Sequence, residues 1–188
     1  MKVQYGDSLY FVWRVAQLEG RRLRASTLDP VHLIIALAKM VDIDFIDLVP
    51  KDAPNRDARI EELLRETRRL RTIFQKAGLD PKIFRRRLRG NVPEPRFAPE
   101  ESEILHRSVE AKQVFSEADN LAEQGGQRHV FPAHLLLAVL MAKDDTRDQV
   151  LVDLGIKKRR LLDATRREVF IIGHSHLPGS QSRNAGRN

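Results

Sequence analysis

Apolar residues recur along nearly the whole chain at the spacing that places them on one face of an α-helix. Near the start of the chain, Phe11, Val12 and Val15 fall close to one side of such a helix. The stretches 58–80 and 102–126 have the same form. No stretch alternates apolar and polar residues between hairpin turns, as the strands of a sheet do. The pattern therefore predicts an all-α fold without a sheet.

Proline, histidine and glycine recur where helices are expected to begin and end. Proline suits the first position of a helix because a backbone N–H there would have no partner within the helix, and proline has no N–H. A neutral histidine at about the third position can bond either the preceding loop or a free backbone N–H group. Glycine readily adopts the left-handed conformation that ends many helices. We expect six residues to have such structural roles: Pro30, His32, Gly78, Pro132, His134 and Gly155.

The same succession of residues occurs twice along the chain. At a separation of 102 positions, His32 corresponds to His134. Further along, the separation falls to 77, and Gly78 corresponds to Gly155. The first copy therefore carries about 25 additional residues, inserted within about 41–66. Self-similarity of this kind indicates a repeat architecture. We expect about eight to ten helices in two pseudo-twofold-related repeats that pack as one domain.

Three prolines between residues 91 and 101 divide the chain nearly in half. We expect the first repeat over residues 1–90, a linker over 91–101 and the second repeat over 102–172. Residues 173–188 show no periodicity, so a disordered tail is expected there.

The doubled motif resembles a known family. The sequences VHLIIAL, from Val31, and AHLLLAV, from Ala133, each follow an alanine-containing helix and precede a helix that ends at glycine. This arrangement resembles the tandem N-terminal repeat (Clp R) domain of the Clp AAA+ unfoldases over about residues 8–170. The resemblance implies an all-α pair of repeats that docks substrates or adaptor proteins and does not catalyse a reaction.

A resemblance to unfoldases raises the question of an ATPase. A phosphate-binding P-loop needs the pattern G-x-x-x-x-G-K-[ST], and the sequence contains no Gly-Lys pair. We therefore expect a free-standing docking domain that needs no cofactor and is not an enzyme. It would act as an adaptor or regulator in proteolysis or protein quality control. The expected partner is a protein or peptide, either a Clp-system component or an unfolded client.

The residue before each repeat histidine departs from the pattern of the resembled family. Many members have an acidic residue there, and some use it to hold a phosphorylated arginine. This chain has Val31 and Ala133 instead. Without carboxylates to meet a guanidinium, we expect no phosphoarginine recognition and a more apolar surface. We predict that the partner contacts six residues of this surface and its preceding loops: Arg24, Thr27, Val31, Arg128, Phe131 and Ala133.

The two histidines also admit a chemical interpretation, as metal ligands or as a general base. A catalytic zinc ion usually has three protein ligands. The sequence pairs His32 with His134 but offers no third ligand beside them. We therefore expect their structural role and no metal site.

Charge supplies a second functional hypothesis. The chain has 33 basic against 26 acidic residues and a net charge of +7. Such a protein can bind nucleic acid through the phosphates. The candidate basic patch comprises Arg85, Arg86, Arg87, Arg89, Lys157, Lys158, Arg159 and Arg160. The alternative function is therefore nucleic-acid or polyanion binding, although basic residues at helix ends also stabilise helices without any ligand.

Two further features concern the location of the protein. The sequence has no apolar segment long enough to cross a bilayer and no apolar core of a signal peptide. It also has no cysteine, which fits a reducing environment. We expect a cytoplasmic protein with no membrane partner.

Overall fold

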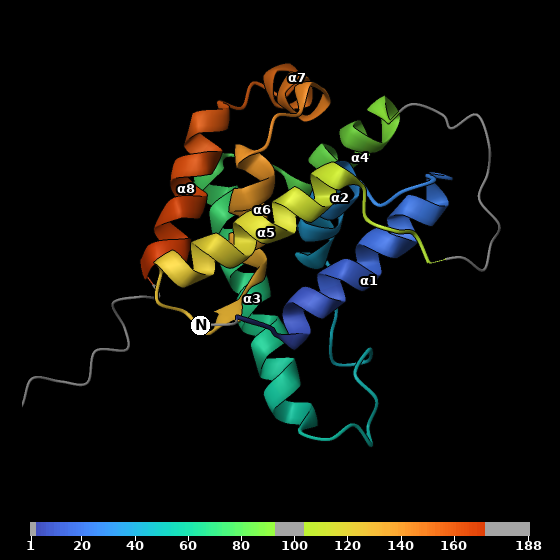
Figure 1. Cartoon of the computed structure of the whole chain (residues 1–188), viewed down its shortest axis with the longest axis vertical. Helices are drawn as coiled ribbons and strands as arrows, with labels where there is room; N and C mark the ends of the chain where they lie inside the picture. The colour runs from blue at the N-terminus through green and yellow to red at the C-terminus, as the bar shows by residue number, and fades with distance from the viewer. Residues whose placement is uncertain (1–2, 93–103, 172–188) are drawn as a thin grey trace, which may run out of the picture.

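A computed structural model describes residues 3–92 and 104–171, which form eight helices (Figure 1). The first repeat supplies α1 (Asp7–Arg22), α2 (Pro30–Met40), α3 (Arg56–Ala77) and α4 (Pro81–Asn91). The second repeat supplies α5 (Val109–Gln124), α6 (Pro132–Met141), α7 (Asp145–Asp153) and α8 (Lys158–Ile171). Most of the expected linker and all of the expected tail lie outside the described residues. No helix in the described part of the chain has the length and apolar character that a membrane span requires.

The helices of the two repeats correspond in register. Helices α1 and α5 begin and end 102 residues apart, and α4 and α8 begin 77 residues apart. Helix α3 has 22 residues, whereas its counterpart α7 has 9. The additional residues of the first repeat therefore form the loop before α3 and the first turns of α3. These turns extend downward from the rest of the molecule in Figure 1.

The two repeats pack through crossed contacts. Helix α3 packs against α8 and α4 packs against α7, so the third helix of each repeat meets the fourth helix of the other. Helices α2 and α6 lie at the centre, and nearly all of their side chains are buried. Helix α1 covers α2 as α5 covers α6. The buried apolar residues of both repeats form one continuous core. The prediction of an all-α, two-repeat fold is confirmed.

The expectation that no sheet is present is wrong in one small respect. Strand β1 (Gln4–Tyr5) pairs in parallel with strand β2 (His129–Val130), and an isolated bridge joins Leu28 to Arg107. The two pairings are counterparts, because each joins the segment before the first helix of one repeat to the loop of the other repeat. Strands of two residues are too short to show an alternating pattern, so no pattern of residues indicated them.

Local backbone chemistry sets several helix ends. Gly78 follows the last residue of α3 with a φ of 74°, and Gly155 follows α7 with a φ of 69°. Glycine adopts this left-handed conformation without the strain that a Cβ atom would cause. At the start of α4, the carboxylate of Asp80 accepts hydrogen bonds from the N–H groups of Lys82 and Ile83. These bonds satisfy two of the backbone donors that a helix start leaves unpaired.

Candidate functional site

A hollow of about 820 Å³ opens where the second repeat meets the start of α2. Five helices surround it, and their ends come together in the upper part of Figure 1. The lining residues are Asp29, Pro30, Val31, Asn91, Val92, Glu110, Gln113, Val114, Glu117, Ala138, Met141, Ala142, Lys143, Asp144 and Thr146.

Apolar side chains form the floor of the hollow. Val114 and Ala138 belong to the buried core, and Val31 packs partly buried against it. Met141, at the end of α6, has 46% of its surface exposed. Methionine is flexible and polarizable, so it adapts to apolar partners of different shapes. An accessible apolar floor of this kind is suited to binding apolar side chains.

The rim of the hollow is acidic. Asp29, Glu110, Glu117 and Asp144 contribute four carboxylates, and Lys143 contributes the one ammonium group among the lining residues. Two carboxylates are fixed by neighbours. Asp29 accepts a hydrogen bond from the Thr27 hydroxyl at 3.2 Å, and Asp144 accepts one from the Arg147 N–H at 2.9 Å. The hollow therefore combines an apolar floor with an excess of negative charge around it.

A buried arginine holds the α6–α7 side of the hollow in place. The side chain of Arg147 is completely buried, and its guanidinium donates to the carbonyls of Val139 and Ala142. These carbonyls lie at the end of α6, where a helix leaves its last acceptors unpaired. The same guanidinium contacts Asp148, which also accepts from Lys158 at 2.7 Å. Although partial burial opposes it, the hydrogen bonds and charges of Lys158 and Arg147 lower the pKa of Asp148.

The two repeat histidines occupy equivalent helix starts. The Nδ1 atom of His32 accepts the N–H of Asp29 at 2.9 Å, and Nδ1 of His134 accepts the N–H of Phe131 at 3.0 Å. Burial lowers the pKa of both imidazoles, and burial together with the nearby charge of Arg69 lowers that of His134 to about 4. Both are therefore neutral at neutral pH, with one ring nitrogen occupied by the backbone.

Of the six residues predicted to contact a partner, Val31 lines the hollow. Ala133 is fully buried, so its side chain has no surface to offer, contrary to what the sequence pattern indicated. Phe131 is partly buried beneath the guanidinium of Arg69, whose Cζ lies 5.8 Å from the ring centre. The remaining three, Arg24, Thr27 and Arg128, do not line the hollow.

Comparison with known proteins places this geometry in a family. Residues 61–154 match the Clp repeat (R) N-terminal domain. The chain belongs to the Clp repeat (R) N-terminal domain family. This confirms the resemblance drawn from the doubled histidine motif. A comparison with curated protein sequences gave no significant match.

Solved structures share the fold of this Clp repeat domain. The Hsp104 N-terminal domain from Candida albicans aligns at a TM-score of 0.59 and 18% identity, over 86% of this chain and 89% of that one. The N-terminal domain of the protease-associated chaperone ClpD from Arabidopsis thaliana aligns at 0.57 and 15%, over 88% and 96%. A structure from a malarial protein secretion system aligns at 0.61 and 15%, over 88% and 94%.

The predicted basic patch of the Clp repeat domain divides between two places. On α4, Arg85 contacts Asp42 at 2.6 Å and Arg89 contacts Glu19 at 2.8 Å, while Arg86 and Arg87 are exposed. Burial of Glu19 would raise the pKa of its carboxyl group, but hydrogen bonds and charge from Arg89 and Lys39 outweigh burial and lower this pKa. Half of the α4 cluster is therefore used in internal ion pairs.

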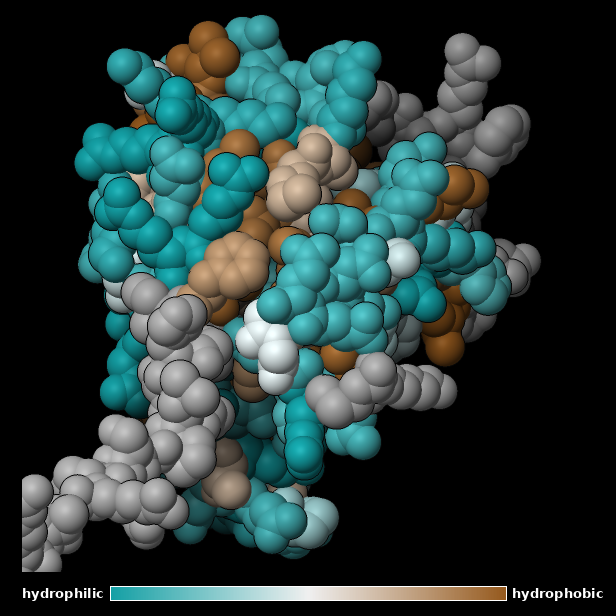
Figure 2. All heavy atoms as spheres, turned by 60° about the vertical axis from the view of Figure 1, so that its left-hand side comes forward, coloured by the Kyte–Doolittle hydropathy of each residue, from teal (hydrophilic) through white to brown (hydrophobic). Residues whose placement is uncertain are grey.

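The second part of the patch lies at the start of α8. Lys158 contacts Asp148, whereas Lys157, Arg159 and Arg160 line a hollow of about 540 Å³. The other residues lining this hollow are Lys76, Asp163, Ala164 and Arg167. Figure 2 turns the side of the molecule that carries α8 toward the viewer, and this face is largely hydrophilic.

The rim residues of the 820 Å³ hollow were not identified from the sequence. Glu110 and Glu117 lie on the polar side of an amphipathic helix, and Asp144 precedes a short one. The sequence around each of these three residues is that of an ordinary solvent-exposed position. Only the packing of five helices from both repeats brings them around one apolar floor.

Proposed function

We propose that this Clp repeat domain is a non-catalytic module that binds proteins or peptides through the 820 Å³ hollow. The observation that carries the proposal is an accessible apolar floor, with Val31 and Met141, in a fold whose family docks clients and adaptors. Its partner would be a Clp-system component or an unfolded client. We place it in the cytoplasm as an adaptor or regulator in proteolysis or protein quality control.

The chemistry of the hollow supports docking rather than catalysis. Its lining residues include carboxylates, a threonine hydroxyl and an ammonium group, but no histidine that could activate a nucleophile. The nearby imidazole of His32 is buried, and its Nδ1 atom already bonds the backbone. Within the described residues, no group of three or more metal-ligating side chains is close enough to hold a metal ion.

A single substitution tests the docking proposal. Val31→Glu would place a charge on the apolar floor, and we expect it to weaken binding of labelled casein, a natively unfolded protein, about tenfold or more. Fluorescence anisotropy of the labelled protein measures the affinity. The matched control is Leu18→Glu, which adds the same charge at an apolar residue of α1 that is 59% exposed and outside the hollow.

Two results would count against docking at this hollow. If the unaltered chain binds neither casein nor the Clp unfoldase of its own cell, the function is wrong. If Val31→Glu and Leu18→Glu weaken binding equally, the binding surface lies elsewhere. Circular dichroism of each variant confirms that the helices are intact.

The alternative function, polyanion binding, has one supporting observation. Lys76, Lys157, Arg159, Arg160 and Arg167 line one hollow against the single carboxylate of Asp163. Phosphate contacts at this hollow would make the affinity for DNA fall steeply with salt. Arg159→Ser should then lower both the affinity and the salt dependence in a gel shift, whereas no DNA binding at low salt would exclude this function.

A further inference from the structure

The pseudo-twofold relation gives the 820 Å³ hollow a counterpart elsewhere on the molecule. At the separation of 102 positions, the lining residues Glu110, Gln113 and Glu117 correspond to Ser8, Phe11 and Val15 of α1. Likewise, Val31 corresponds to Ala133. We call the surface formed by Ser8, Phe11, Val15 and Ala133 the counterpart surface.

The counterpart surface is covered, whereas the hollow is open. Ser8 and Ala133 have no exposed area, Val15 has 5% and Phe11 is partly buried, whereas Glu110 and Gln113 are exposed and Val31 is only partly buried. The difference arises although the surrounding helices correspond in register. Something present in the first repeat and absent from the second must therefore lie over the counterpart surface.

The inserted residues of the first repeat make this cover. Glu62 of α3 accepts hydrogen bonds from the N–H and the hydroxyl of Ser8, at 3.0 and 2.7 Å. Phe45, in the loop before α3, packs edge-on against Phe11 with ring centres 4.9 Å apart. Two residues of the insertion thus contact the counterparts of two residues that line the open hollow.

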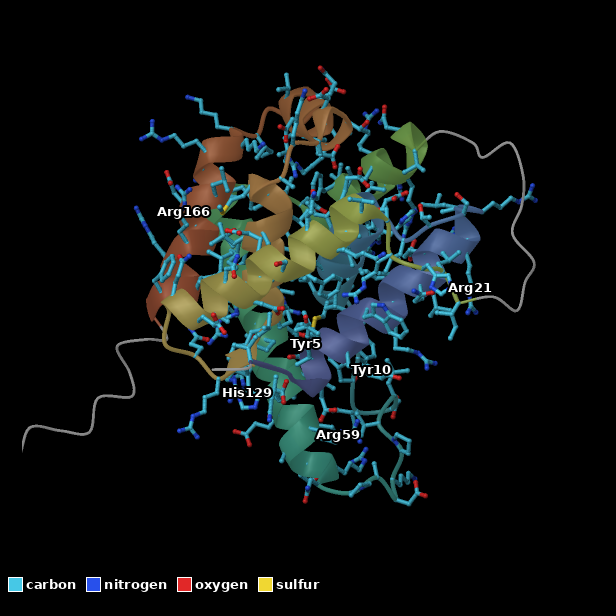
Figure 3. All side chains as sticks on the ribbon, viewed as in Figure 1. Tyr5, Tyr10, Arg21, Arg59, His129 and Arg166 are labelled. Carbon is cyan, nitrogen blue, oxygen red and sulfur yellow. The ribbon has the colours of Figure 1, made fainter. Side chains whose placement is uncertain are left out.

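The first turns of α3 form the helical part of the cover. Helix α7 begins at Asp145, which corresponds to Arg68 of α3 at the separation of 77. The twelve residues that α3 has before Arg68 form about three turns that α7 lacks. Figure 3 shows Arg59 on these turns, near the start of α1, where its guanidinium contacts Asp7 at 2.9 Å. The counterpart surface is therefore occupied by a helical segment of the chain itself.

We propose that the open hollow takes an amphipathic, basic helix of a partner protein, in the place that the first turns of α3 hold on the counterpart surface. This inference rests on the docking function proposed above. Apolar side chains of the partner helix pack on Val31 and Met141. Its lysines or arginines meet the carboxylates of Asp29, Glu110, Glu117 and Asp144.

Charge determines which kind of helix fits. The counterpart surface is neutral at Ser8, Phe11 and Val15, but the hollow has Glu110 and Glu117 at two of the three equivalent positions. Glu110 is exposed and has no side-chain partner among the described contacts. An acidic helix would place like charges against these carboxylates, whereas a basic helix places opposite charges there.

The cover also fixes the number of sites. Two related repeats would otherwise present two equivalent surfaces, but the insertion occupies one of them. The chain therefore binds one partner helix per molecule.

Three designed peptides test the inference on the full chain. Each has about 14 residues, roughly four turns. The first has leucine on one face and lysine on the other, the second replaces lysine by glutamate, and the third adds a central proline to the first. Fluorescence anisotropy and calorimetry give affinity and stoichiometry. We expect the first to bind at one per chain, and the other two to bind at least about tenfold more weakly.

Charge reversal then locates the site. Glu110→Lys should weaken the lysine peptide about tenfold and strengthen the glutamate peptide. Glu61→Lys is the matched control, because Glu61 is exposed on α3, lines no described hollow and changes the net charge equally. We expect the control to leave both affinities within about twofold of the unaltered chain.

Each adverse outcome has a distinct meaning. Equal binding of the proline peptide would overturn the helical occupant while leaving the docking function intact. Two peptides per chain, or equal effects of Glu110→Lys and Glu61→Lys, would show that the hollow is not the single site. If sedimentation shows that the chain dimerises through the hollow, the occupant is a second copy of the chain and not a partner helix. If neither peptides nor casein bind, the docking function itself fails.

Discussion

His32 and His134 show how one side chain can start a helix in each repeat. Each imidazole accepts the N–H of the residue three positions earlier, while its Nε2 atom is buried without a hydrogen-bond partner in the described structure. The arrangement requires the neutral ring, because a protonated imidazole has no acceptor. Protonation therefore breaks the helix-start hydrogen bond and places a charge in the core.

The pH dependence of stability follows from His134. Its pKa is about 4 in the folded chain, against 6.5 for an ordinary histidine, so the unfolded state binds more protons between these values. We expect the contribution of His134 to the free energy of unfolding to be constant above about pH 7. This contribution should fall by about 3 kcal/mol as the pH is lowered from 6.5 toward 4, and His32, whose pKa is also lowered by burial, acts in the same direction.

Urea denaturation at several pH values checks this expectation. His134→Asn keeps an acceptor at the helix start but does not titrate, so its stability should fall less steeply between pH 6.5 and 5. Burial raises the pKa of Glu66, next to Arg69, which acts in the opposite direction in both proteins. Identical pH profiles for the variant and the unaltered chain would show that His134 is not the group responsible.

At the scale of elements, both repeats use an arginine to complete the end of their second helix. Arg71 of α3 donates to the carbonyl of Val41, just after α2, at 2.9 Å. Arg147 of α7 donates to the carbonyls of Val139 and Ala142, at the end of α6. The third helix of each repeat is thereby attached to the second through backbone acceptors.

Removing the buried arginine should loosen the α6–α7 side of the hollow. Arg147→Met leaves two helix-end carbonyls without their donor, and we expect a loss of about 3 kcal/mol in the free energy of unfolding, measured in urea. Arg166→Met is the control, since its side chain is 52% exposed and its contact with Asp163 is 3.9 Å long. The control should change stability by less than about 0.5 kcal/mol. Equal stability of the two variants would contradict the role of Arg147.

The sequence predicted the elements better than the surfaces they form. The separations of 102 and 77 positions anticipated the register of α1 with α5 and of α4 with α8, because those helices are repeated. The burial of Ala133 was not predictable, because the local pattern of a helix start does not reveal which other elements pack against it. Arg147 has the local pattern of a surface residue, and only its contacts with α6 explain its burial.

At the scale of the whole molecule, the repeats are interlocked rather than placed side by side. Across the repeat boundary, the side-chain amide of Gln17 accepts a hydrogen bond from the N–H of Leu105 at 3.0 Å and donates one to the carbonyl of Leu105 at 2.8 Å. The β1–β2 pairing and the bridge of Leu28 to Arg107 add two more connections. These contacts, with the crossed helix packing and the common core, make the two repeats one cooperative unit.

Cutting the chain between the repeats should therefore not separate them. With a specific protease site introduced within residues 93–103, we expect the two halves to remain associated after cleavage and to unfold in one transition. Size-exclusion chromatography and thermal denaturation measure both properties. Halves that elute separately under native conditions would show that each repeat is an independent unit.

The paired short strands have a consequence for how the protein is made. Gln4 of the first repeat can pair only after His129 of the second has been synthesised, and Leu28 can pair only after Arg107. At a synthesis rate of roughly 5–20 residues per second, Gln4 and Leu28 are synthesised on the order of ten seconds before their partners. The nascent first repeat cannot complete its contacts alone during that interval, so the domain reaches its native structure only after the second repeat has been synthesised.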